Sequence, residues 1–562
     1  MPYERPDGSK VKSSLEAIVE KFKNSKSAEE QISCVKEFEK EISHFSTMES
    51  LAYIRNTVDT RDKFYEEEME FFNSFGPVLS ETINSFNKEL VYSPFRNELE
   101  ERMGKVAFKN AEMELKSFSP EIIPLMQEEN RLSSEYQKLY ASAQIPFEGK
   151  TLTIAQLGVY KKDTDRTMRR KAIEAEGSFF DEHRAEFDEI YDKLVKVRTE
   201  QAKKLGFENF VTLGYMRQGR NCYGIQDVAN FRRQVLEDIV PIVVDLKKGQ
   251  AERLSLDSLK LYDDDFHFID GDPAPKGTPE EILASGIRMY KEMSPETREF
   301  ITLMEDMELF DLLAKEGKAP GGYCTSIPDY KCPFIFSNFN GTDGDVEVLT
   351  HEAGHAFADY IASRNIEFTS SHSPSMDGCE THSMSMEFLT SPWHHLFFKE
   401  DTDKYELSHA EKALSFIPYG TMVDYFQQLV YENYNWTPEE RNKAWDELEK
   451  KFRPWIDRSG IPFYGRGAGW QRQLHIYLYP FYYLDYCMAQ TNALNVFALF
   501  LEDRDNAWKT YMKFVKMGGT KFFTELCRET GLKSPTDDGC LKETIEKITP
   551  WLKEKQKPFF KK

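Results

Sequence analysis

Two histidines and a glutamate lie close together in residues 348–360, which read VLTHEAGHAFADY. His351 and His355 are four residues apart, so on a helix their side chains project from one face, about 40° apart and one turn from each other. Two imidazoles at this spacing can bind one metal ion. Glu352 is rotated by about 100° from His351, so its carboxylate can activate a metal-bound water without binding the metal. This HExxH pattern predicts a catalytic zinc helix, and the alternative is a surface helix with titratable residues.

A third protein ligand is expected, because catalytic zinc usually has three protein ligands and one open position. The metzincin continuation of HExxH is absent, since Ala and Ile occupy the positions that it reserves for Gly and His. Glu380 lies on a downstream segment that predicts a helix, although His372 and His382 compete with it as ligands. Glu387, seven residues later and on nearly the same face, could hydrogen-bond a ligand histidine. The ordinary alternatives are a helix cap for Glu380 and a solvated surface acid for Glu387.

The segments around these residues predict a mainly α protein. Residues 333–339 (PFIFSNF) are aromatic and bounded by Pro333 and the turn NGTDGD, which predicts a short strand before the HExxH helix. The first ~200 residues predict successive helices. In SSLEAIVEKFKN the apolar residues recur at helical spacing: Leu15, Ile18, Val19 and Phe22. Similar periodicity in FDEIYDKLVKVRTEQAKKLGF and VANFRRQVLEDIVPIVVDLKK extends the pattern, with no repeat of fixed period.

Composition narrows the class of protein. The formal net charge of -22 gives an acidic surface that repels phosphate and anionic lipid, so we expect neither nucleic acid nor a membrane as a partner. The N-terminus has no apolar core of signal-peptide length and no later window approaches ~18 apolar residues, so we expect a soluble cytoplasmic protein. The eight cysteines form no CxxC pair, which favours reduced thiols over disulfides or a cysteine zinc site.

Two further segments resemble ligand sites only superficially. Residues 260–281 contain five aspartates, but their order does not match an EF-hand calcium loop, so a solvated hairpin or loop is expected. The stretch GRGAG lacks the residues of a phosphate-binding loop and predicts a flexible hinge. It precedes HIYLYPFYYLDY, a run rich in tyrosine.

Several of these motifs occur together in a known family. Glu380 follows His351 by 29 positions, FIFSNFNGTDGDVEVLTHEAGHAF precedes it and HIYLYPFYYLDY follows it. With these motifs the sequence resembles oligoendopeptidase F and the Pz-peptidase-type zinc oligopeptidases, relatives of thimet oligopeptidase, most strongly over about residues 321–490. The resemblance implies a mainly α fold with two helical lobes around a deep substrate channel and a small antiparallel sheet beside the HExxH helix. We expect an N-terminal helical lobe over 1–200 and a catalytic domain over 201–562, with segments shared across this boundary.

The resemblance also implies roles for individual residues. His351, His355 and Glu380 would bind one Zn²⁺, and Glu352 would activate the zinc-bound water. The FIFSNFNG strand would be an edge strand along the channel, where an extended peptide could pair with its backbone by β-addition. The implied substrate-binding residues of this strand are Phe336, Ser337, Asn338 and Phe339. The implied donors to the oxyanion are His475, Tyr479 and Tyr486, with Tyr482 and Tyr483 nearby as substrate contacts, whereas the ordinary alternative for such a tyrosine run is core packing.

The predicted function is that of a zinc-dependent endopeptidase. It would hydrolyse internal bonds of short or unfolded peptides, with a monomer or small homo-oligomer as the open choices of assembly. One alternative is a metallocarboxypeptidase of the Taq type, whose HES pattern is weakened here because Cys379 stands where it has His. The other is a peptide-binding relative without catalysis, which the intact Glu352 argues against.

Overall fold

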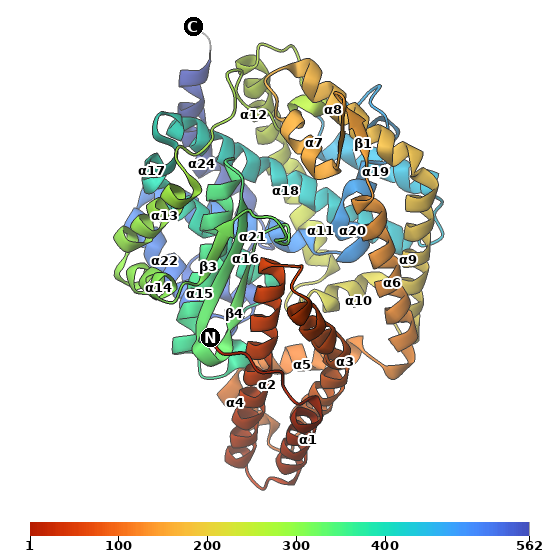
Figure 1. Cartoon of the computed structure of the whole chain (residues 1–562), viewed down its shortest axis with the longest axis vertical. Helices are drawn as coiled ribbons and strands as arrows, with labels where there is room; N and C mark the ends of the chain where they lie inside the picture. The colour runs from red at the N-terminus through yellow and green to blue at the C-terminus, as the bar shows by residue number, and fades with distance from the viewer. Residues whose placement is uncertain (561–562) are drawn as a thin grey trace. The chain divides into compact units, whose positions relative to one another are not determined.

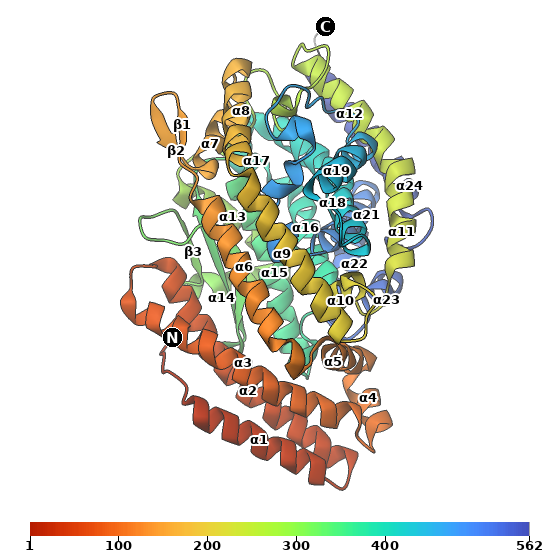
Figure 2. The same ribbon diagram turned by 90° about the vertical axis from the view of Figure 1, so that its right-hand side faces the viewer.

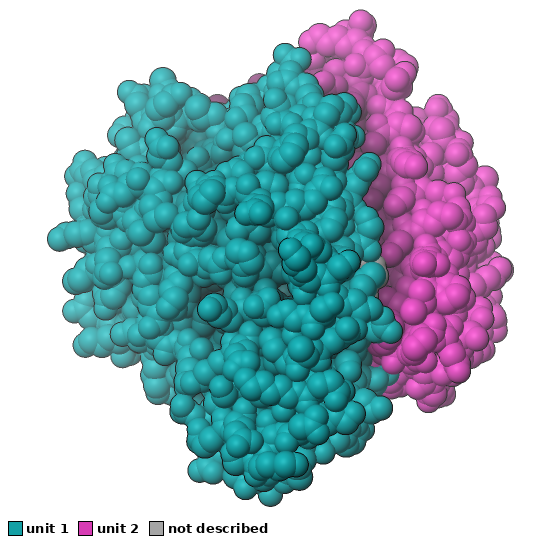
Figure 3. Space-filling model, turned by 60° about the horizontal axis from the view of Figure 1, so that its bottom comes forward, with its two compact units in different colours: residues 1–116, 274–402, 492–534 teal, residues 117–273, 403–491, 535–562 magenta. Residues whose placement is uncertain are grey.

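The computed structural model describes residues 1–560, which are mainly helical (Figure 1). They form two compact units, each assembled from three segments and coloured separately in Figure 3. Unit 1 comprises residues 1–116, 274–402 and 492–534, and unit 2 comprises residues 117–273, 403–491 and 535–562. The helical segments within residues 1–200, which the sequence suggested as one lobe, are therefore divided between the units after Lys116.

The N-terminal part of unit 1 is a group of helices that begins with α1 (Gly8–Asn24), α2 (Ala28–Val58) and α3 (Lys63–Val91). The predicted apolar stripe of α1 is buried, and Asp7 caps the helix by accepting a hydrogen bond from the Lys10 backbone N–H at 3.1 Å. Phe38 of α2 stacks on Phe86 of α3 at a centroid distance of 4.0 Å. The shorter α4 (Arg96–Met103) and α5 (Lys105–Ser117) follow. The periodicity of α1 was therefore a reliable guide to its buried face.

A three-stranded sheet lies beside these helices in unit 1. Its strands are β3 (Phe310–Leu313), β4 (Tyr323–Ile327) and β5 (Cys332–Phe339), in the order β3-β5-β4. The strand predicted from PFIFSNF is β5, and its antiparallel partner is β4, whereas β3 pairs with it in parallel. Nearly all of β5 is buried, as expected of a continuous apolar run in a central strand.

The central position of β5 corrects one prediction. Its backbone is paired with a strand on each side, so it is not the edge strand that was expected to receive a peptide. The stretch proposed for substrate, Phe336 to Phe339, includes residues paired with β3, and the Asn338 amide donates to the backbone carbonyls of Ala319 and Gly321 at 2.8 and 2.9 Å. Within the described sheet, β4 is the edge next to the HExxH helix.

Helix α15 (Gly344–Asn365) carries the HExxH pattern and lies between the sheet and α16 (Met376–Leu389), as Figure 1 shows. Asp345 fixes the turn before this helix, because its carboxylate accepts hydrogen bonds from the backbone N–H groups of Asn340 and Gly341 at 2.9 and 2.8 Å. The remaining α-helices of unit 1 are α13 (Pro279–Met293), α14 (Pro295–Asp306), α17 (His395–Phe398), the later turns of α21 (Tyr483–Glu502), α22 (Arg504–Met517) and α23 (Phe523–Thr530). Of these, α13, α14 and α22 also pack against α15, so the helix is supported on several faces.

Unit 2 is helical apart from the hairpin of β1 (Ile145–Phe147) and β2 (Lys150–Leu152). Long helices α6 (Ile123–Ala141) and α9 (Arg184–Lys204) pack along each other (Figure 2). The other helices are α7 (Ile154–Lys161), α8 (Arg166–Glu182), α10 (Phe210–Arg217), α11 (Ile225–Gln234), α12 (Val240–Arg253), α18 (Thr402–Glu432), α19 (Pro438–Phe452), α20 (Leu474–Leu478), α24 (Cys540–Gln556) and the first turns of α21 (Tyr483–Glu502).

The periodic segment around residues 228–248 forms two helices rather than one. A π-helical turn at Val235–Ile239 joins α11 to α12. Pro241, at the second position of α12, cannot donate a backbone hydrogen bond and would clash with the carbonyl four residues earlier in a regular α-helix. The wider π turn accommodates this local conflict.

The aspartate-rich segment is largely an irregular loop, as expected, but its first part, which includes Asp263 and Asp264, is buried and not solvated. Asp263 is fully buried and forms an ion pair of 2.9 Å with Arg169. Asp264 pairs with Lys247 at 2.8 Å, and although burial alone would raise its pKa, its cationic neighbours lower that pKa to about 2. These aspartates are held by protein cations and need no calcium ion.

Two composition-based expectations can be compared with the described residues. All eight cysteines are free thiols, as the absence of CxxC pairs indicated. In the helices over residues 1–560, no stretch is both long and apolar enough to cross a membrane.

Candidate metal centre and active site

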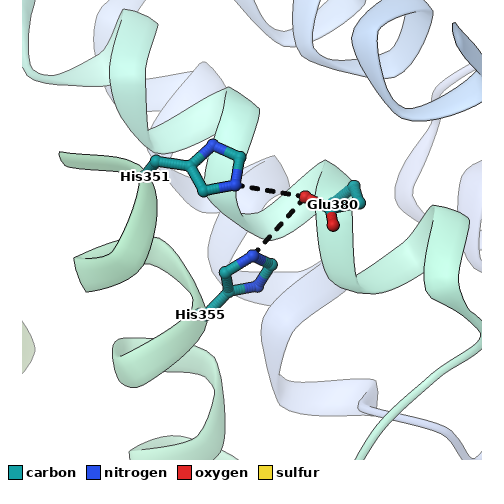
Figure 4. A group of neighbouring side chains, drawn as sticks. All are labelled: His351, His355 and Glu380. Atoms are coloured by element: carbon teal, nitrogen blue, oxygen red, sulfur yellow. Dashed lines mark ion pairs between the residues drawn. The ribbon is translucent and has the colours of Figure 1, made fainter. Parts of the chain in front are cut away.

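Three side chains from α15 and α16 converge on one point in unit 1 (Figure 4). The Glu380 Oε2 atom lies 3.2 Å from His351 Nε2 and 3.4 Å from His355 Nε2. The two imidazole rings are 5.0 Å apart and nearly perpendicular. One donor atom from each residue falls within 4.8 Å of the others. The spacing argument from the sequence therefore corresponds to an actual convergence of two nitrogens and one oxygen.

The separations of these atoms fit a tetrahedral zinc ion. Zinc bonds of about 2.0–2.1 Å at tetrahedral angles place two ligand atoms about 3.3 Å apart. Both measured distances from Glu380 Oε2 to the imidazole nitrogens agree with this value. Two neutral imidazoles and one carboxylate are also the donor set of several catalytic zinc sites, with a fourth position open for water. The residues present thus fit a catalytic metal centre.

A glycine in the HExxH sequence allows the two helices to approach closely. A Cβ atom at Gly354 would lie 2.6 Å from Ser383 Cα and 2.8 Å from the His382 carbonyl oxygen on α16. Such distances are incompatible with any side chain at this position. Glu380 reaches the histidines because α15 and α16 are in near backbone contact at Gly354. Sequence reasoning did not identify this residue, although a glycine in the interior of a helix is itself a sign of close packing.

Hydrogen bonds from α16 orient the candidate ligands. The His351 Nδ1–H group donates to Glu387 Oε1 at 2.8 Å, which leaves Nε2 as the nitrogen that faces Glu380. The Ser383 hydroxyl donates to Glu380 Oε2 at 3.0 Å. Burial alone would lower the pKa of His351, but Glu380 and Glu387 outweigh it and raise that pKa well above its usual value. The carboxylates of Glu380 and Glu387 therefore favour a positive charge at this site.

Glu352 lies between this cluster and the sheet. Its carboxylate accepts a hydrogen bond from the backbone N–H of Cys324 in β4. Burial raises the pKa of Glu352, while the nearby histidines oppose the rise. A carboxylate with a raised pKa beside a metal site is suited to take and return a proton near neutral pH. Because the N–H of Cys324 points to Glu352, it is directed away from β5 and toward the outer edge of β4.

The histidines that competed as ligands lie elsewhere. His372 Nε2 bonds to the backbone carbonyl of Ile366 at 3.0 Å. His382, itself a residue of α16, is buried against Phe514 of α22, where burial lowers its pKa to about 3 and keeps it neutral. Asp359, one turn after His355 on α15, packs against β4 and accepts the Ser326 hydroxyl at 3.2 Å. None of the three belongs to the His351, His355 and Glu380 cluster.

The tyrosine-rich segment of unit 2 forms a cluster around His475. The ring centroids of four tyrosines lie 4.8 to 6.3 Å from the His475 ring: Tyr479, Tyr482, Tyr483 and Tyr486. Tyr479 is 59% exposed and the other three are half-buried. Tyr477, in the same segment, is fully buried and stacks on Tyr136 at 3.9 Å. Core packing therefore accounts for Tyr477, whereas the rings around His475 retain access to solvent.

A hydrogen-bond chain determines which nitrogen of His475 carries the proton. The Tyr419 hydroxyl donates to Gln473 Oε1 at 2.8 Å, so Gln473 Nε2 is the donor to His475 Nδ1 at 3.1 Å. The neutral imidazole must then carry its proton on Nε2. Burial lowers the pKa of His475, which favours this neutral form. Gln473 was not among the predicted residues, and its only sequence signal is its position two residues before His475.

Comparisons with known proteins are consistent with these features. Residues 159–545 match the family described as Peptidase family M3, and residues 1–118 match the Peptidase M3 N-terminal domain. A structure of Pz peptidase A with an inhibitor is 49% identical, covers 99% of each chain and has a TM-score of 0.92. An oligoendopeptidase F structure from Bacillus anthracis strain Ames is 45% identical, covers 98% of this chain and 97% of its own, and has a TM-score of 0.87.

A curated relative gives a shorter match. The oligoendopeptidase F homolog of Borreliella burgdorferi is 25% identical over 260 residues, which are 44% of this chain. The match spans 42% of that relative's length.

Proposed function

This chain belongs to peptidase family M3, and we propose that it is a zinc-dependent oligoendopeptidase that cleaves internal bonds of short or unfolded peptides. The observation that carries the proposal is the convergence of His351, His355 and Glu380, with Glu352 between this cluster and a strand edge. That arrangement combines a metal-binding group, a proton acceptor and a backbone surface for a peptide. The Taq-type and non-catalytic alternatives account for fewer of these features.

In the proposed mechanism Glu352 transfers the proton, and the other residues bind the metal or orient its ligands. Bound by His351, His355 and Glu380, zinc would polarise the scissile carbonyl and lower the pKa of a water molecule. Glu352 accepts a proton from the attacking water and returns it to the leaving amine. The backbone N–H of Cys324 orients the Glu352 carboxylate for both steps. Glu387 holds the ring of His351 in the ligating orientation.

The substrate backbone is assigned to β4 instead of β5. Strand β4 is the edge of the sheet beside α15, and Cys324 at its centre contacts Glu352. The N–H of Cys324 is occupied by Glu352. A peptide added antiparallel or parallel to residues 323–327 would therefore pair with the outward N–H of Ser326 and the outward C=O groups of Cys324 and Ser326. Main-chain pairing accepts many side chains, so it suits an enzyme for varied peptides. It also requires an extended substrate, which excludes folded proteins.

The donors to the oxyanion are assigned to unit 2. His475, with its proton on Nε2, and the hydroxyls of Tyr479 and Tyr486 are neutral donors of the kind that stabilise a tetrahedral oxyanion. Tyr482 and Tyr483 border His475 and are assigned to substrate contacts. Neutral donors are preferable to cations here because they add no competing charge next to a metal.

The proposal is tested with Glu352→Gln, which keeps the shape of the side chain but cannot accept a proton. We expect zinc content to remain at one ion per chain, while kcat on an internally quenched peptide falls about 100-fold or more. Glu305→Gln, an exposed acid of α14 paired with Lys291, is the matched control and should keep wild-type activity. Wild-type turnover by Glu352→Gln would reject the mechanism.

A second substrate separates the alternatives. A peptide with a blocked C-terminus should be cut internally by an endopeptidase, whereas a carboxypeptidase would stall on it and a binding protein would cut neither peptide. Zinc removal by a chelator should abolish cleavage, and added zinc should restore it.

A further inference from the structure

Unit 2 contains a cavity of about 450 Å³ that the proposed reaction does not use. Its size falls within the range of small-molecule and peptide-residue pockets. It is lined by the two segments that the sequence did not predict to bind a ligand, the aspartate-rich stretch through Asp264 and Asp265, and the glycine-rich loop through Gly469. Helices α7, α8, α18 and α19 supply other walls. The cavity thus brings together distant polar segments of the chain.

Most charged groups that line this cavity are already neutralised within the protein. Glu176 has no exposed surface, accepts the Tyr464 hydroxyl and forms ion pairs with Lys161 and Arg472. Asp264 is paired with Lys247, as described above. These buried acids form ion pairs with Lys161 and Lys247 and neutralise their charges. The cavity is therefore not a broad cationic surface that would attract a polyanion.

Arg472 differs from the other cations of the cavity. Its Nε atom pairs with Glu176 Oε1 at 3.1 Å, and among the described residues no other hydrogen bond or ion pair holds its guanidinium group. The side chain is 46% exposed although it lines a concave site. Glu176 therefore fixes one edge of the guanidinium, and the terminal nitrogens remain available to a ligand. Two terminal N–H groups on one planar guanidinium can donate to both oxygens of a carboxylate at once, which is a bidentate arrangement.

The same cavity adjoins the candidate oxyanion donors. Gln473, which follows Arg472 in sequence, lines the cavity and donates to His475 Nδ1 at 3.1 Å. Tyr483 also lines it, and its ring lies 4.8 Å from the His475 ring. A ligand group beside Arg472 would therefore lie next to two residues that contact His475 directly.

We propose that this cavity is a substrate subsite in which Arg472 binds a carboxylate of the peptide. The inference rests on the proposed function, since it takes His475 to face the peptide bond under attack. A single open guanidinium, with its neighbouring cations already paired, suits a monoanionic carboxylate better than a phosphate dianion. In a peptide that carboxylate is the C-terminal α-carboxylate or the side chain of Asp or Glu. Binding of the terminus would limit how many residues can follow the cleaved bond.

The test measures peptide binding without requiring turnover. Calorimetry with the Glu352→Gln protein compares one neutral peptide in three forms: free C-terminal acid, C-terminal amide, and amide with one internal Glu. We expect at least one carboxylate-bearing form to bind about tenfold or more tightly than the neutral amide, as for a hydrogen-bonded charge. Preference for the free acid identifies the terminus as the source, and preference for the Glu peptide identifies the side chain. Equal affinity for all three forms would overturn the proposal.

Substitution of Arg472 assigns the preference to this residue. Arg472→Gln in the Glu352→Gln background should remove the difference between the forms, and Arg472→Lys should restore only part of it because the fork is lost. Arg131→Gln, an exposed and ion-paired arginine of α6 outside the cavity, is the matched control and should keep the preference. Retention of the full preference by Arg472→Gln with a native melting temperature would overturn the proposal.

The outcome is separable from that of the proposed function. If wild-type protein fails to cleave any peptide but binding still depends on Arg472, the subsite stands and the endopeptidase assignment falls. If cleavage follows the predictions but no carboxylate preference is measured, only the subsite is wrong.

Discussion

His351 on α15 and Glu387 on α16 share a hydrogen bond of 2.8 Å between Nδ1 and Oε1. This contact fixes which nitrogen of His351 faces the other two candidate ligands. Glu387→Gln should keep a hydrogen bond but remove the charge that makes the imidazole a better ligand, so we expect zinc affinity to fall about 10–100-fold. Competition with a fluorescent chelator measures the change, and Glu305→Gln serves as the control. An unchanged zinc affinity would mean that Glu387 has no role in metal binding.

Gly354 should tolerate no side chain. In Gly354→Ala the new Cβ would lie 2.6 Å from Ser383 Cα, so α16 must shift and carry Glu380 away from the histidines. We expect a destabilisation of about 1–3 kcal/mol, as for an overpacked core, together with weaker zinc binding. Thermal unfolding with and without added zinc measures both effects.

Gly158→Ala provides the matched comparison for this prediction. Gly158 lies in α7, and a Cβ there would have no atom within 4 Å. Alanine should therefore raise helix stability slightly, by up to about 1 kcal/mol. Equal effects of the two substitutions would contradict the packing argument.

His475 should contribute to the rate more than to binding. If its Nε2–H group donates to the oxyanion, His475→Ala should lower kcat about 100-fold and change KM little. Gln473→Leu removes the donor to Nδ1 and permits the other tautomer, so a smaller loss of kcat is expected, with the histidine itself still present. Steady-state kinetics on one quenched peptide provides both values. A loss confined to KM would indicate that this segment only binds substrate.

Unit 2 should lose stability in acid through Glu411. Burial alone would raise the pKa of this carboxyl, but Arg253 and His267 lower it to about 2. A group whose folded pKa is depressed stabilises the protein above its unfolded pKa of about 4.3, and this contribution disappears as the pH falls toward 2. The amount is on the order of 3 kcal/mol at neutral pH. Urea unfolding midpoints should therefore decline between about pH 4.5 and pH 2.

Glu411→Gln checks this assignment. It leaves the buried guanidinium of Arg253, paired with Glu411 at 2.7 Å, without its counter-charge, so we expect a loss of about 3–5 kcal/mol at pH 7 and a shallower decline in acid. Glu439→Gln, at an exposed acid paired with Arg184, should behave as wild type. An unaltered acid profile for Glu411→Gln would contradict the prediction.

Features set by local geometry could be predicted from the sequence. The four-residue spacing of His351 and His355, and the seven-residue spacing of Glu380 and Glu387, depend only on the helical repeat. The buried stripe of α1 and the strand formed by PFIFSNF follow from local periodicity and composition in the same way. For these features the structure agrees with the sequence because no distant residue is needed to specify them.

Features that depend on distant pairing could not be predicted. Strand β3 is only four residues long, and nothing in its sequence indicates that it pairs beside β5 and removes that strand from the edge. Asp264 was assigned to a solvated loop because local patterns do not reveal its pairing with Lys247 of α12 and with Arg453, which lies 189 residues later. The need for glycine at position 354 arises from α16, which local patterns on α15 do not reveal.

The segmented composition of unit 1 bears on how the protein is made in the cell. Its first segment, residues 1–116, is completed only by packing with residues 274–402 and 492–534. At about 5–20 residues per second, a ribosome needs roughly 20–75 s to travel from the end of the first segment to the start of the third. During that interval the apolar faces of α1 to α3 lack part of their final surroundings. Newly made chains should therefore depend on chaperones more than a protein of equal length with consecutive domains.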